Sequence, residues 1–398
     1  MKILQIVDKG PEGGGVARHV QDLTDALRRQ GHDTSVLRLR ADGAADEASL
    51  PWTFGPLQGL HRLRALRRLL AHLDPSLIQV HAGFTTLSPV LLRALRRARP
   101  TVGMLHDVSP FCFLGTRRFH SGATDCQRRV GAGCVSCGCY RPRSVLGWLR
   151  VAREVLVRAW LLKEWRALPQ LIVPSEYLRQ LALRHGFDAQ RVTLIPHFTS
   201  APPDDATAAS APPLIVFVGR LTREKGVFCL FEALARLTDL PWQAALIGAG
   251  PGREVLAQTA ARHGFADRLR WHGVLAVAER NAVLRSAYLL VFPSLIAEGF
   301  GLTGIEALAY GKPVAGFPAG GASEWLRHGE TGIAAAEGDA PALAQALRTL
   351  LCDPALASRL GENGRRLVRA RFAAKPCIAD LCAIYARARE GFGRRARA

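Results

Sequence analysis

The sequence predicts an α/β protein with two domains, each built on a doubly wound parallel sheet. Its 398 residues are too many for one ordinary hydrophobic core. A strand, a glycine-bearing loop and an amphipathic helix open the chain at residues 2–27, and the same order returns at residues 214–237. Between them, residues 199–213 have no periodicity and are rich in alanine and proline, as in a linker.

The expected N-terminal domain covers residues 1–198. Apolar runs predict strands at 2–7, 34–39, 76–81, 101–105, 171–173 and 192–195, and helical spacing predicts helices at 16–27, 57–73, 88–97 and 148–165. Gly13, Gly14 and Gly15 lie in the first loop, where glycines let backbone amides approach a ligand. The loop lacks the Gly-x-Gly-x-x-Gly spacing and the acidic ribose contact of dinucleotide enzymes, which disfavours an NAD-dependent oxidoreductase.

The expected C-terminal domain covers residues 214–374. We predict strands at 214–218, 243–247, 269–271, 287–292 and 313–315, and helices at 227–237, 254–263, 276–286, 304–310, 341–351 and 355–370. The segment 375–398 is expected to form a helix that crosses back to the N-terminal domain.

Residues 287–309 carry the most informative pattern. A buried strand leads into a glycine-bearing loop, and the loop opens onto a helix N-terminus. Such a junction offers unpaired backbone N–H groups and the positive end of a helix dipole, which suit phosphate. Glu298 lies in the loop and Glu306 follows on the helix. A phosphate site beside two carboxylates suits a ligand with a diphosphate and several hydroxyls, such as a nucleotide sugar.

The formal net charge is +20, and residues 1–200 hold 29 of the 53 basic but only 15 of the 33 acidic residues. A basic surface attracts nucleic acid, anionic lipid or anionic glycan. No nucleic-acid-binding motif accompanies the charge, so we expect no nucleic-acid partner. The start does not resemble a signal peptide and no run of about 18 apolar residues occurs, which favours a cytoplasmic protein. The basic helix at 148–165, which contains tryptophans, either lies on a membrane or buries its apolar stripe.

Residues 108–143 interrupt the α/β order and are rich in cysteine. Cys134, Cys137 and Cys139 follow Cys126 with spacings that could clamp a structural zinc ion or an iron–sulfur cluster. Reduced cysteines in an ordered loop are the alternative reading.

Several motifs together carry a family resemblance. The set resembles the retaining glycosyltransferases of family 4 (group 1), which have the two-Rossmann GT-B fold, and it covers nearly the whole chain. Its members, in order, are Gly13–His19, His106-Asp107, Val173–Glu176, Gly219-Arg220-Leu221, Glu224-Lys225-Gly226, Gly248-x-Gly250-Pro251, Glu298-x7-Glu306, Gly320-Gly321-x-x-Glu324 and Gly329-x-x-Gly332. Where relatives often carry Pro-Asn-Gly, this chain has Pro196-His197-Phe198, so no role is carried to that position.

The resemblance implies that a nucleotide sugar binds in the cleft between the domains. Arg220 and Lys225 would neutralise the leaving diphosphate without a metal ion. Glu298 would accept hydrogen bonds from the donor sugar, Glu306 from the ribose, and His106 would lie near the anomeric carbon. The remaining donor-binding positions are glycines and backbone amides, namely Gly14, Gly15, Gly219, Gly248, Phe300, Gly301 and Leu302.

The implied activity is metal-independent, retaining sugar transfer from a nucleotide-diphosphate sugar to a glycan or glycolipid in cell-surface polysaccharide or lipopolysaccharide-type biosynthesis. The acceptor hydroxyl would attack from the face that the diphosphate leaves, and a phosphate oxygen would take its proton. The enzyme would act in the cytoplasm, peripherally at the inner membrane face. The alternative is a non-catalytic, metal-bearing binding protein on a degenerate transferase scaffold.

Overall fold

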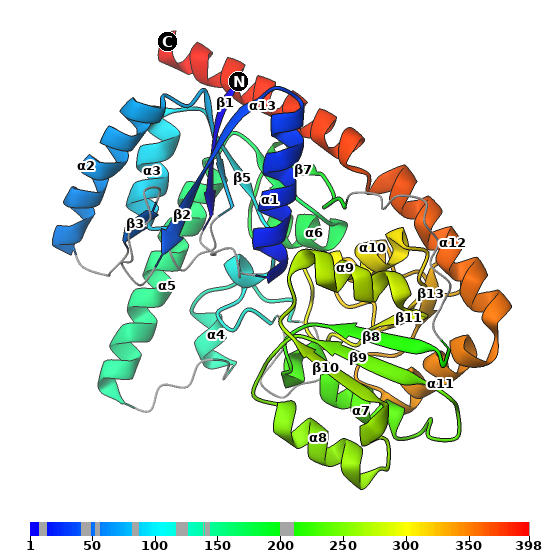
Figure 1. Cartoon of the computed structure of the whole chain (residues 1–398). Helices are drawn as coiled ribbons and strands as arrows, with labels where there is room; N and C mark the ends of the chain where they lie inside the picture. Colours follow the sequence, from blue (N-terminus) through cyan, green and yellow to red (C-terminus); the bar gives the residue numbers. More distant parts are fainter. Residues whose placement is uncertain are drawn as a thin grey trace. The chain divides into compact units, whose positions relative to one another are not determined.

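The computed structural model describes residues 1–7, 14–40, 49–51, 56–81, 87–116, 126–137, 139, 144–199 and 211–397. The chain divides into two compact units, which we describe separately (Figure 1). Unit 1 comprises Met1–His197 and Ala374–Ala398, and unit 2 comprises Phe198–Ala373. Most of the predicted linker, residues 200–210, lies outside the described residues.

Unit 1 contains a seven-stranded parallel sheet with the order β3-β2-β1-β4-β5-β6-β7. The order changes direction between the neighbours β1 and β4, and parallel sheets bind ligands at the carboxyl ends of strands beside such a point. The strands are β1 (Lys2–Val7), β2 (Asp33–Arg40), β3 (Ser49–Pro51), β4 (Leu77–Val80), β5 (Thr101–Met104), β6 (Leu171–Val173) and β7 (Val192–Leu194). The helices are α1 (Gly14–Arg29), α2 (Pro56–Leu73), α3 (Pro89–Ala98), α4 (Gly133–Ser136), α5 (Val145–Arg166), α6 (Glu176–Arg184) and α13 (Ala374–Arg397), with 3-10 turns η1 (Ser109–Phe111) and η2 (Ala189–Arg191).

The last helix, α13, packs into unit 1. The Tyr385 hydroxyl is fully buried and donates a hydrogen bond to Gln79 Oε1 of β4. Gln79 Nε2 in turn donates to Met104 Sδ of β5 at 3.3 Å. Burial raises the pKa of Tyr385 well above its ordinary value, so the phenol stays a hydrogen-bond donor and ties α13 to the sheet.

Unit 2 contains a six-stranded parallel sheet with the order β10-β9-β8-β11-β12-β13. Here the order changes direction between β8 and β11. The strands are β8 (Leu214–Val218), β9 (Gln243–Ile247), β10 (Leu269–Gly273), β11 (Leu289–Phe292), β12 (Val314–Gly316) and β13 (Gly332–Ala334). The helices are α7 (Val227–Leu234), α8 (Arg253–Arg262), α9 (Val277–Ser286), α10 (Leu302–Ala309), α11 (Ala340–Cys352) and α12 (Pro354–Arg371), with 3-10 turns η3 (Arg223–Lys225), η4 (Ala266–Arg268) and η5 (Gly321–Glu324).

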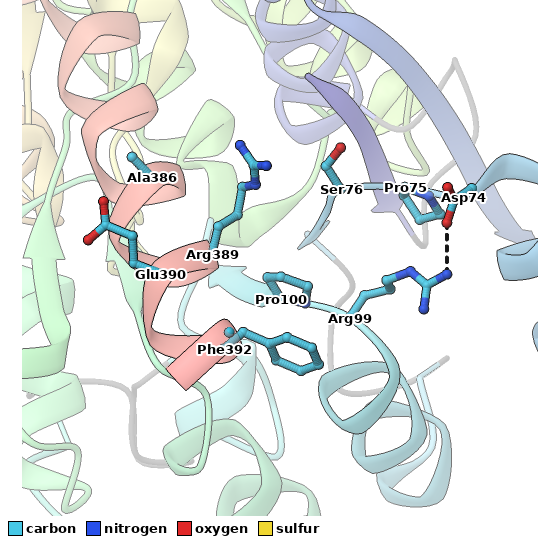
Figure 2. A pocket seen from close by; sticks show the side chains of 10 residues that line it. Asp74, Pro75, Ser76, Arg99, Pro100, Ala386, Arg389, Glu390 and Phe392 are labelled. Atoms are coloured by element: carbon cyan, nitrogen blue, oxygen red, sulfur yellow. Dashed lines mark hydrogen bonds and ion pairs between the residues drawn. The ribbon is translucent and has the colours of Figure 1, made fainter. Parts of the chain in front are cut away.

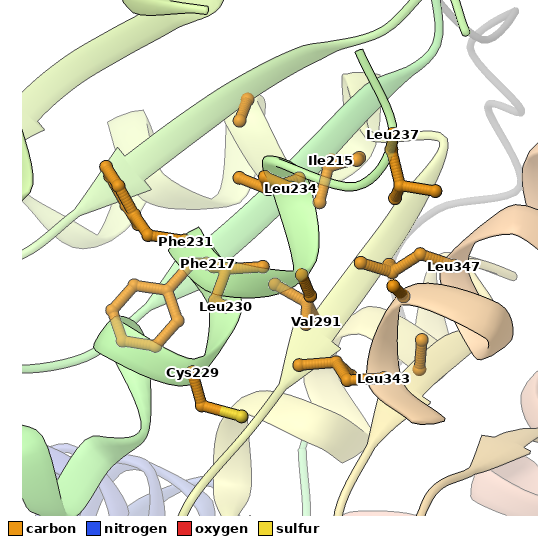
Figure 3. Packing of buried hydrophobic residues seen from close by; sticks show 14 of the residues in the cluster. Ile215, Phe217, Cys229, Leu230, Phe231, Leu234, Leu237, Val291, Leu343 and Leu347 are labelled. Carbon is orange, nitrogen blue, oxygen red and sulfur yellow. The ribbon is translucent and has the colours of Figure 1, made fainter. Parts of the chain in front are cut away.

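One face of the unit 2 sheet packs against α7 and α11. Phe217 and Val291 of the sheet meet Leu230 of α7 and Leu343 of α11 in a buried cluster (Figure 3). Each fully buried side chain of this size stabilises the fold by about 1.5–3 kcal/mol relative to its exposed state. The cluster therefore holds the ends of β8 and β11 in place for the loops that follow them.

Strands β3 and β13 were not expected from the sequence. Both are three residues long and lie at the edges of their sheets. Edge strands of this length carry no long apolar run, so pairing with a neighbour, not local pattern, defines them.

Candidate functional site

The loops after β8 and β11 bring together a lysine and a glutamate of unit 2. Lys225 Nζ donates to Glu298 Oε1 at 2.6 Å, and Ser294 Oγ donates to the same oxygen at 2.6 Å. The two residues are 73 positions apart in the chain and meet because β8 and β11 are neighbours in the sheet. An ammonium has three protons, so Lys225 can hold Glu298 and still donate to an anion.

The N-terminus of α10 follows this loop. Gly301 caps the helix with φ +84°, a conformation that side-chain-bearing residues rarely adopt. A Cβ at Gly301 would also lie 2.9 Å from the Phe292 ring, and Trp325 Nε1 donates to Phe300 O at 2.6 Å. These contacts hold the backbone so that the first N–H groups of α10, which have no partner inside the helix, form a site suited to phosphate.

Glu306 lies one turn further along α10 and is buried. Its Oε1 accepts a hydrogen bond from Arg280 Nη2 of α9 at 2.7 Å. The sequence analysis missed Arg280, because nothing in its local pattern distinguishes it from other helical arginines.

Arg220 and Gly219 lie in the loop after β8, and Gly248 lies in the loop after β9. Arg220 is exposed and pairs with Glu224 at 3.3 Å. A Cβ at Gly248, which has φ +135°, would lie 1.9 Å from Gly219 O. The two loops thus pack backbone against backbone, and Gly248 serves this close approach whatever else it binds.

Four histidines of unit 1 lie together. One is in helix α1, and the other three follow strands β4, β5 and β7. His81 Nδ1 and His106 Nε2 are 2.9 Å apart, and His106 Nδ1 and His197 Nε2 are 3.2 Å apart. The rings of His19 and His197 lie 3.9 Å apart between centroids. We call these four residues the histidine cluster. Sequence reasoning proposed only His106 for the site and gave His197 no role.

Burial lowers the pKa of His19 to about 3 and, with a smaller effect of His19, lowers that of His81 to about 3. Burial also holds the pKa of His197 well below its ordinary value, with smaller effects of His19 and His81. These three rings are neutral near pH 7. A neutral imidazole donates from one nitrogen and accepts at the other. The contacts to His81 and His197 use both ring nitrogens of His106.

Asp107, the other half of the His-Asp motif, is engaged locally. Its Oδ1 accepts from Ser109 N at 2.9 Å and from Ser109 Oγ at 2.5 Å. The carboxylate therefore shapes the turn after β5.

The cysteine segment forms no metal-binding arrangement among the residues that the structure describes. Cys137 Sγ contacts Cys139 Sγ at 3.4 Å and Cys134 O at 3.4 Å, while Cys126 is buried. The suggested zinc or iron–sulfur site at Cys126, Cys134, Cys137 and Cys139 gains no support from this geometry, nor does a metal-bearing binding protein.

A cavity of about 630 Å³ lies at the amino ends of the unit 1 strands β4 and β5 (Figure 2). Ser76 and Pro100, which line it, directly precede β4 and β5, and α13 closes one side with Arg389 and Phe392. Because ligands of open parallel sheets bind at the carboxyl ends of strands, this cavity at the amino ends is not the expected ligand site.

Comparison with known proteins gives two adjoining family matches. The family model "Glycosyl transferases group 1" matches residues 203–367, and the model "Glycosyltransferase Family 4" matches residues 13–200. The chain is 28% identical over 410 residues to a glycogen synthase of Mycobacterium tuberculosis (strain CDC 1551 / Oshkosh), covering 95% of this chain and 92% of that protein. It is 34% identical over 194 residues to a lipopolysaccharide core biosynthesis mannosyltransferase of Rhizobium leguminosarum bv. viciae, covering 46% of this chain and 54% of that protein.

Solved structures show the same fold. Sucrose-phosphate synthase of Thermosynechococcus elongatus superposes with a TM-score of 0.70 at 22% identity, covering 97% of this chain and 99% of that one. Anabaena Alr3699/HepE in complex with UDP-glucose superposes with a TM-score of 0.68 at 19% identity, covering 97% and 100%. The predicted α/β fold of GT-B type is thereby confirmed.

Proposed function

The chain belongs to the family 4 (group 1) glycosyltransferases, and we propose that it transfers a sugar from a nucleotide-diphosphate sugar, with retention of configuration, to a glycan or glycolipid acceptor. The observation that carries the proposal is the contact of Lys225, in the loop after β8, with Glu298 and Ser294 in the loop before α10. A cation and a carboxylate near a helix N-terminus support binding of a ligand with both phosphate and hydroxyl groups. The solved complexes of Anabaena Alr3699/HepE with UDP and with UDP-glucose support a nucleotide-sugar donor.

In this proposal the diphosphate binds the N–H groups at the start of α10, with the side chains of Lys225 and Arg220 as counter-charges. Two cations in place of a divalent ion make the reaction metal-independent. Glu298 accepts hydrogen bonds from the sugar, and the hydrogen bonds from Lys225 and Ser294 fix the orientation of its carboxylate. Gly14 and Gly15 contribute backbone amides at the start of α1.

Glu306 binds the ribose while Arg280 orients it. A carboxylate has about four acceptor positions, so Glu306 can accept from a ribose hydroxyl and keep the 2.7 Å contact to Arg280. The remaining donor contacts come from the backbone of Phe300, Gly301 and Leu302. Gly219 and Gly248 permit the loop that carries Arg220 to pack closely against the loop after β9.

For the chemical step, the bond from the anomeric carbon to the diphosphate breaks while the acceptor oxygen bonds to that carbon from the same face. The acceptor's proton moves to an oxygen of the leaving phosphate, and the protein supplies position and charge. Glu298 is held by two donors and acts in binding, not as a nucleophile. Within unit 1, His81 and His197 would orient His106, the residue that the family motifs assign to the sugar pocket.

The acceptor belongs to a cell-surface glycan of the polysaccharide or lipopolysaccharide type. The similarity to the lipopolysaccharide core mannosyltransferase and to a D-rhamnosyltransferase of Pseudomonas aeruginosa motivates this choice. No helix among the described residues is long and apolar enough to cross a membrane. The basic excess of the first half of the chain would hold the enzyme, from the cytoplasmic side, at the anionic inner membrane face.

A thermal-shift screen against nucleotide-diphosphate sugars that differ in base and sugar tests the donor. We expect one donor to raise the unfolding temperature, because a ligand that binds only the folded state stabilises it. Glu298→Ala should lose both this shift and transfer, whereas Glu330→Ala, which removes a surface carboxylate of the same unit, should keep both. A Glu298→Ala enzyme with unchanged shift and activity would refute the assignment.

Two further measurements test the finer claims. Proton NMR of the product should show the anomeric configuration of the donor, and an inverted product would exclude retention. Activity should survive a chelator, and a loss that Mg²⁺ restores would exclude metal-independent transfer.

A further inference from the structure

Helix α5 carries an apolar face that is open to solvent. Its exposed large hydrophobic side chains range from 42% exposure at Trp160 to 78% at Val145, and the others are Leu146, Trp148, Leu149 and Leu156. The rest of the described chain holds five such side chains, dispersed over other elements: Val90, Leu114, Val255, Val274 and Val277. We call the six residues of α5 the α5 apolar face. Such a concentration marks an interaction surface.

The opposite side of α5 is anchored in unit 1. Val151, Arg158 and Trp165 are buried, and their spacing of seven places them on one side of the helix. Arg158 Nη1 donates to Ser109 O at 2.6 Å, and Glu164 pairs with Arg96 of α3 at 2.6 Å. The helix is therefore fixed on one side, and its orientation presents the α5 apolar face outward.

Helical geometry makes the face continuous. At 100° per residue, Val145, Leu149, Leu156 and Trp160 fall within roughly 60° of arc, opposite the buried side. Trp148 and Trp160 are separated by roughly 18 Å along the axis, because each residue rises about 1.5 Å. Figure 1 shows α5 as a single long helix of unit 1.

Charge indicates which partner fits this face. The exposed charged residues of α5 are all basic, namely Arg150, Arg153, Lys163 and Arg166. Its two acidic residues are engaged in ion pairs, Glu154 with Arg158 and Glu164 with Arg96. Tryptophan and leucine flanked by arginine is the composition that binds the interface of an anionic bilayer. A second copy of the chain would bring like charge against like charge, since the net charge is +20.

We propose that the α5 apolar face docks on the surface of an anionic lipid bilayer, with its leucines and tryptophans between the headgroups and its arginines on the phosphates. The proposal rests on the proposed function and adds to it, since it names the surface through which unit 1 meets a membrane that carries the acceptor. The helix lies in the plane of the interface and does not cross the bilayer.

The test is binding of the full chain to lipid vesicles. Wild-type protein should sediment with vesicles that contain phosphatidylglycerol and far less with phosphatidylcholine alone. The double variant Leu149→Glu/Leu156→Glu should reduce the bound fraction by at least about tenfold, because it removes two apolar anchors and adds repulsion. The matched control Val255→Glu/Val277→Glu changes two exposed valines of unit 2 and should bind as wild type does.

A second readout follows tryptophan directly. Fluorescence of the wild type should shift to the blue and be quenched by brominated lipid, and Trp148→Ser/Trp160→Ser should lose most of this response. The proposal is overturned if the Leu149/Leu156 variant binds anionic vesicles as the wild type does. It is equally overturned if the wild type forms a dimer that this variant breaks while neither binds lipid.

Donor binding separates this proposal from the proposed function. The Leu149→Glu/Leu156→Glu protein should keep the thermal shift with the nucleotide sugar, since neither residue belongs to the donor site. If the variant loses lipid binding but keeps the thermal shift, the result supports docking of α5. If the wild type itself shows no thermal shift with any nucleotide sugar, the proposed donor is wrong, but the vesicle result still tests docking.

Discussion

The two units share one sheet topology but differ in the charge of the side chains that gather at the carboxyl ends of their strands. Each is a parallel sheet whose strand order changes direction once, between β1 and β4 in unit 1 and between β8 and β11 in unit 2. At that edge unit 2 gathers ion pairs, Lys225 with Glu298 and Arg280 with Glu306. Unit 1 gathers the histidine cluster, in which His19, His81 and His197 are buried and neutral near pH 7. The sheet decides where polar groups converge, and the loop residues decide whether they carry charge.

The largest expected effect is on the charged site. Lys225→Ala should lower the rate of transfer by about 10²–10³-fold, because it removes a charge that stabilises the leaving diphosphate. Initial rates with saturating donor would measure the loss. Arg327→Ala, which removes a surface cation of unit 2, is the control and should leave the rate unchanged. Equal rates for the wild type and Lys225→Ala would show that Lys225 serves only the loop.

The buried ion pair should matter for stability. Arg280→Met should destabilise the protein by about 3 kcal/mol, because it removes the guanidinium that pairs with the buried Glu306. The double variant Arg280→Met/Glu306→Leu should recover much of this stability, since the buried carboxylate is gone as well. Denaturant unfolding followed by fluorescence would measure both. If the double variant is no more stable than the single one, the ion pair is not what the arginine contributes.

The buried histidines should make the stability of the protein depend on pH. Below about pH 6.5 an unfolded chain protonates His81, but the folded chain keeps it neutral down to its pKa of about 3. Because the unfolded state then binds more protons, stability falls as pH falls through this window and is unaffected above it. Each such histidine contributes about 1.4 kcal/mol per pH unit at most.

His81→Phe tests this slope. Between pH 6 and pH 4 the variant should lose stability less steeply than the wild type, by about the contribution of one histidine. His328→Gln, at an exposed position of unit 2, should keep the wild-type slope. Denaturant midpoints at several pH values would decide, and parallel profiles for wild type and His81→Phe would show that His81 protonates equally in both states.

The smallest effect should come from an exposed ion pair. Asp239→Asn breaks the contact with Arg348, whose Nη1 lies 2.7 Å from Asp239 Oδ2 on the surface of unit 2. The loss of stability should be the smallest of the series, since water screens exposed charges. Denaturant unfolding would measure the loss of stability. If Asp239→Asn destabilises the protein as much as Arg280→Met does, burial does not determine how much an ion pair contributes.

Periodicity and glycine spacing were sufficient to predict most of the fold. A short apolar run that ends in a glycine-bearing loop, such as Leu289–Phe292, favours a buried strand, and the family motifs follow such runs at strand ends. The three-residue strands β3 and β13 could not be predicted, because strand pairing alone defines them. The donor-loop residues Lys225 and Glu298 were named from their motifs, but their mutual contact was not foreseen.

By itself, the sequence determined the α/β fold of the two domains and the family, because local pattern and glycine positions follow directly from chain order. The residues for a diphosphate and a sugar are proposed from the same motifs. Only the tertiary structure decided that Arg280 pairs with Glu306, that four histidines from separate elements meet at one site, and that the apolar face of α5 points outward. The physical reason is the same in each case: partners and burial depend on which strands and helices are neighbours in space, and a residue's own sequence neighbourhood carries no record of that.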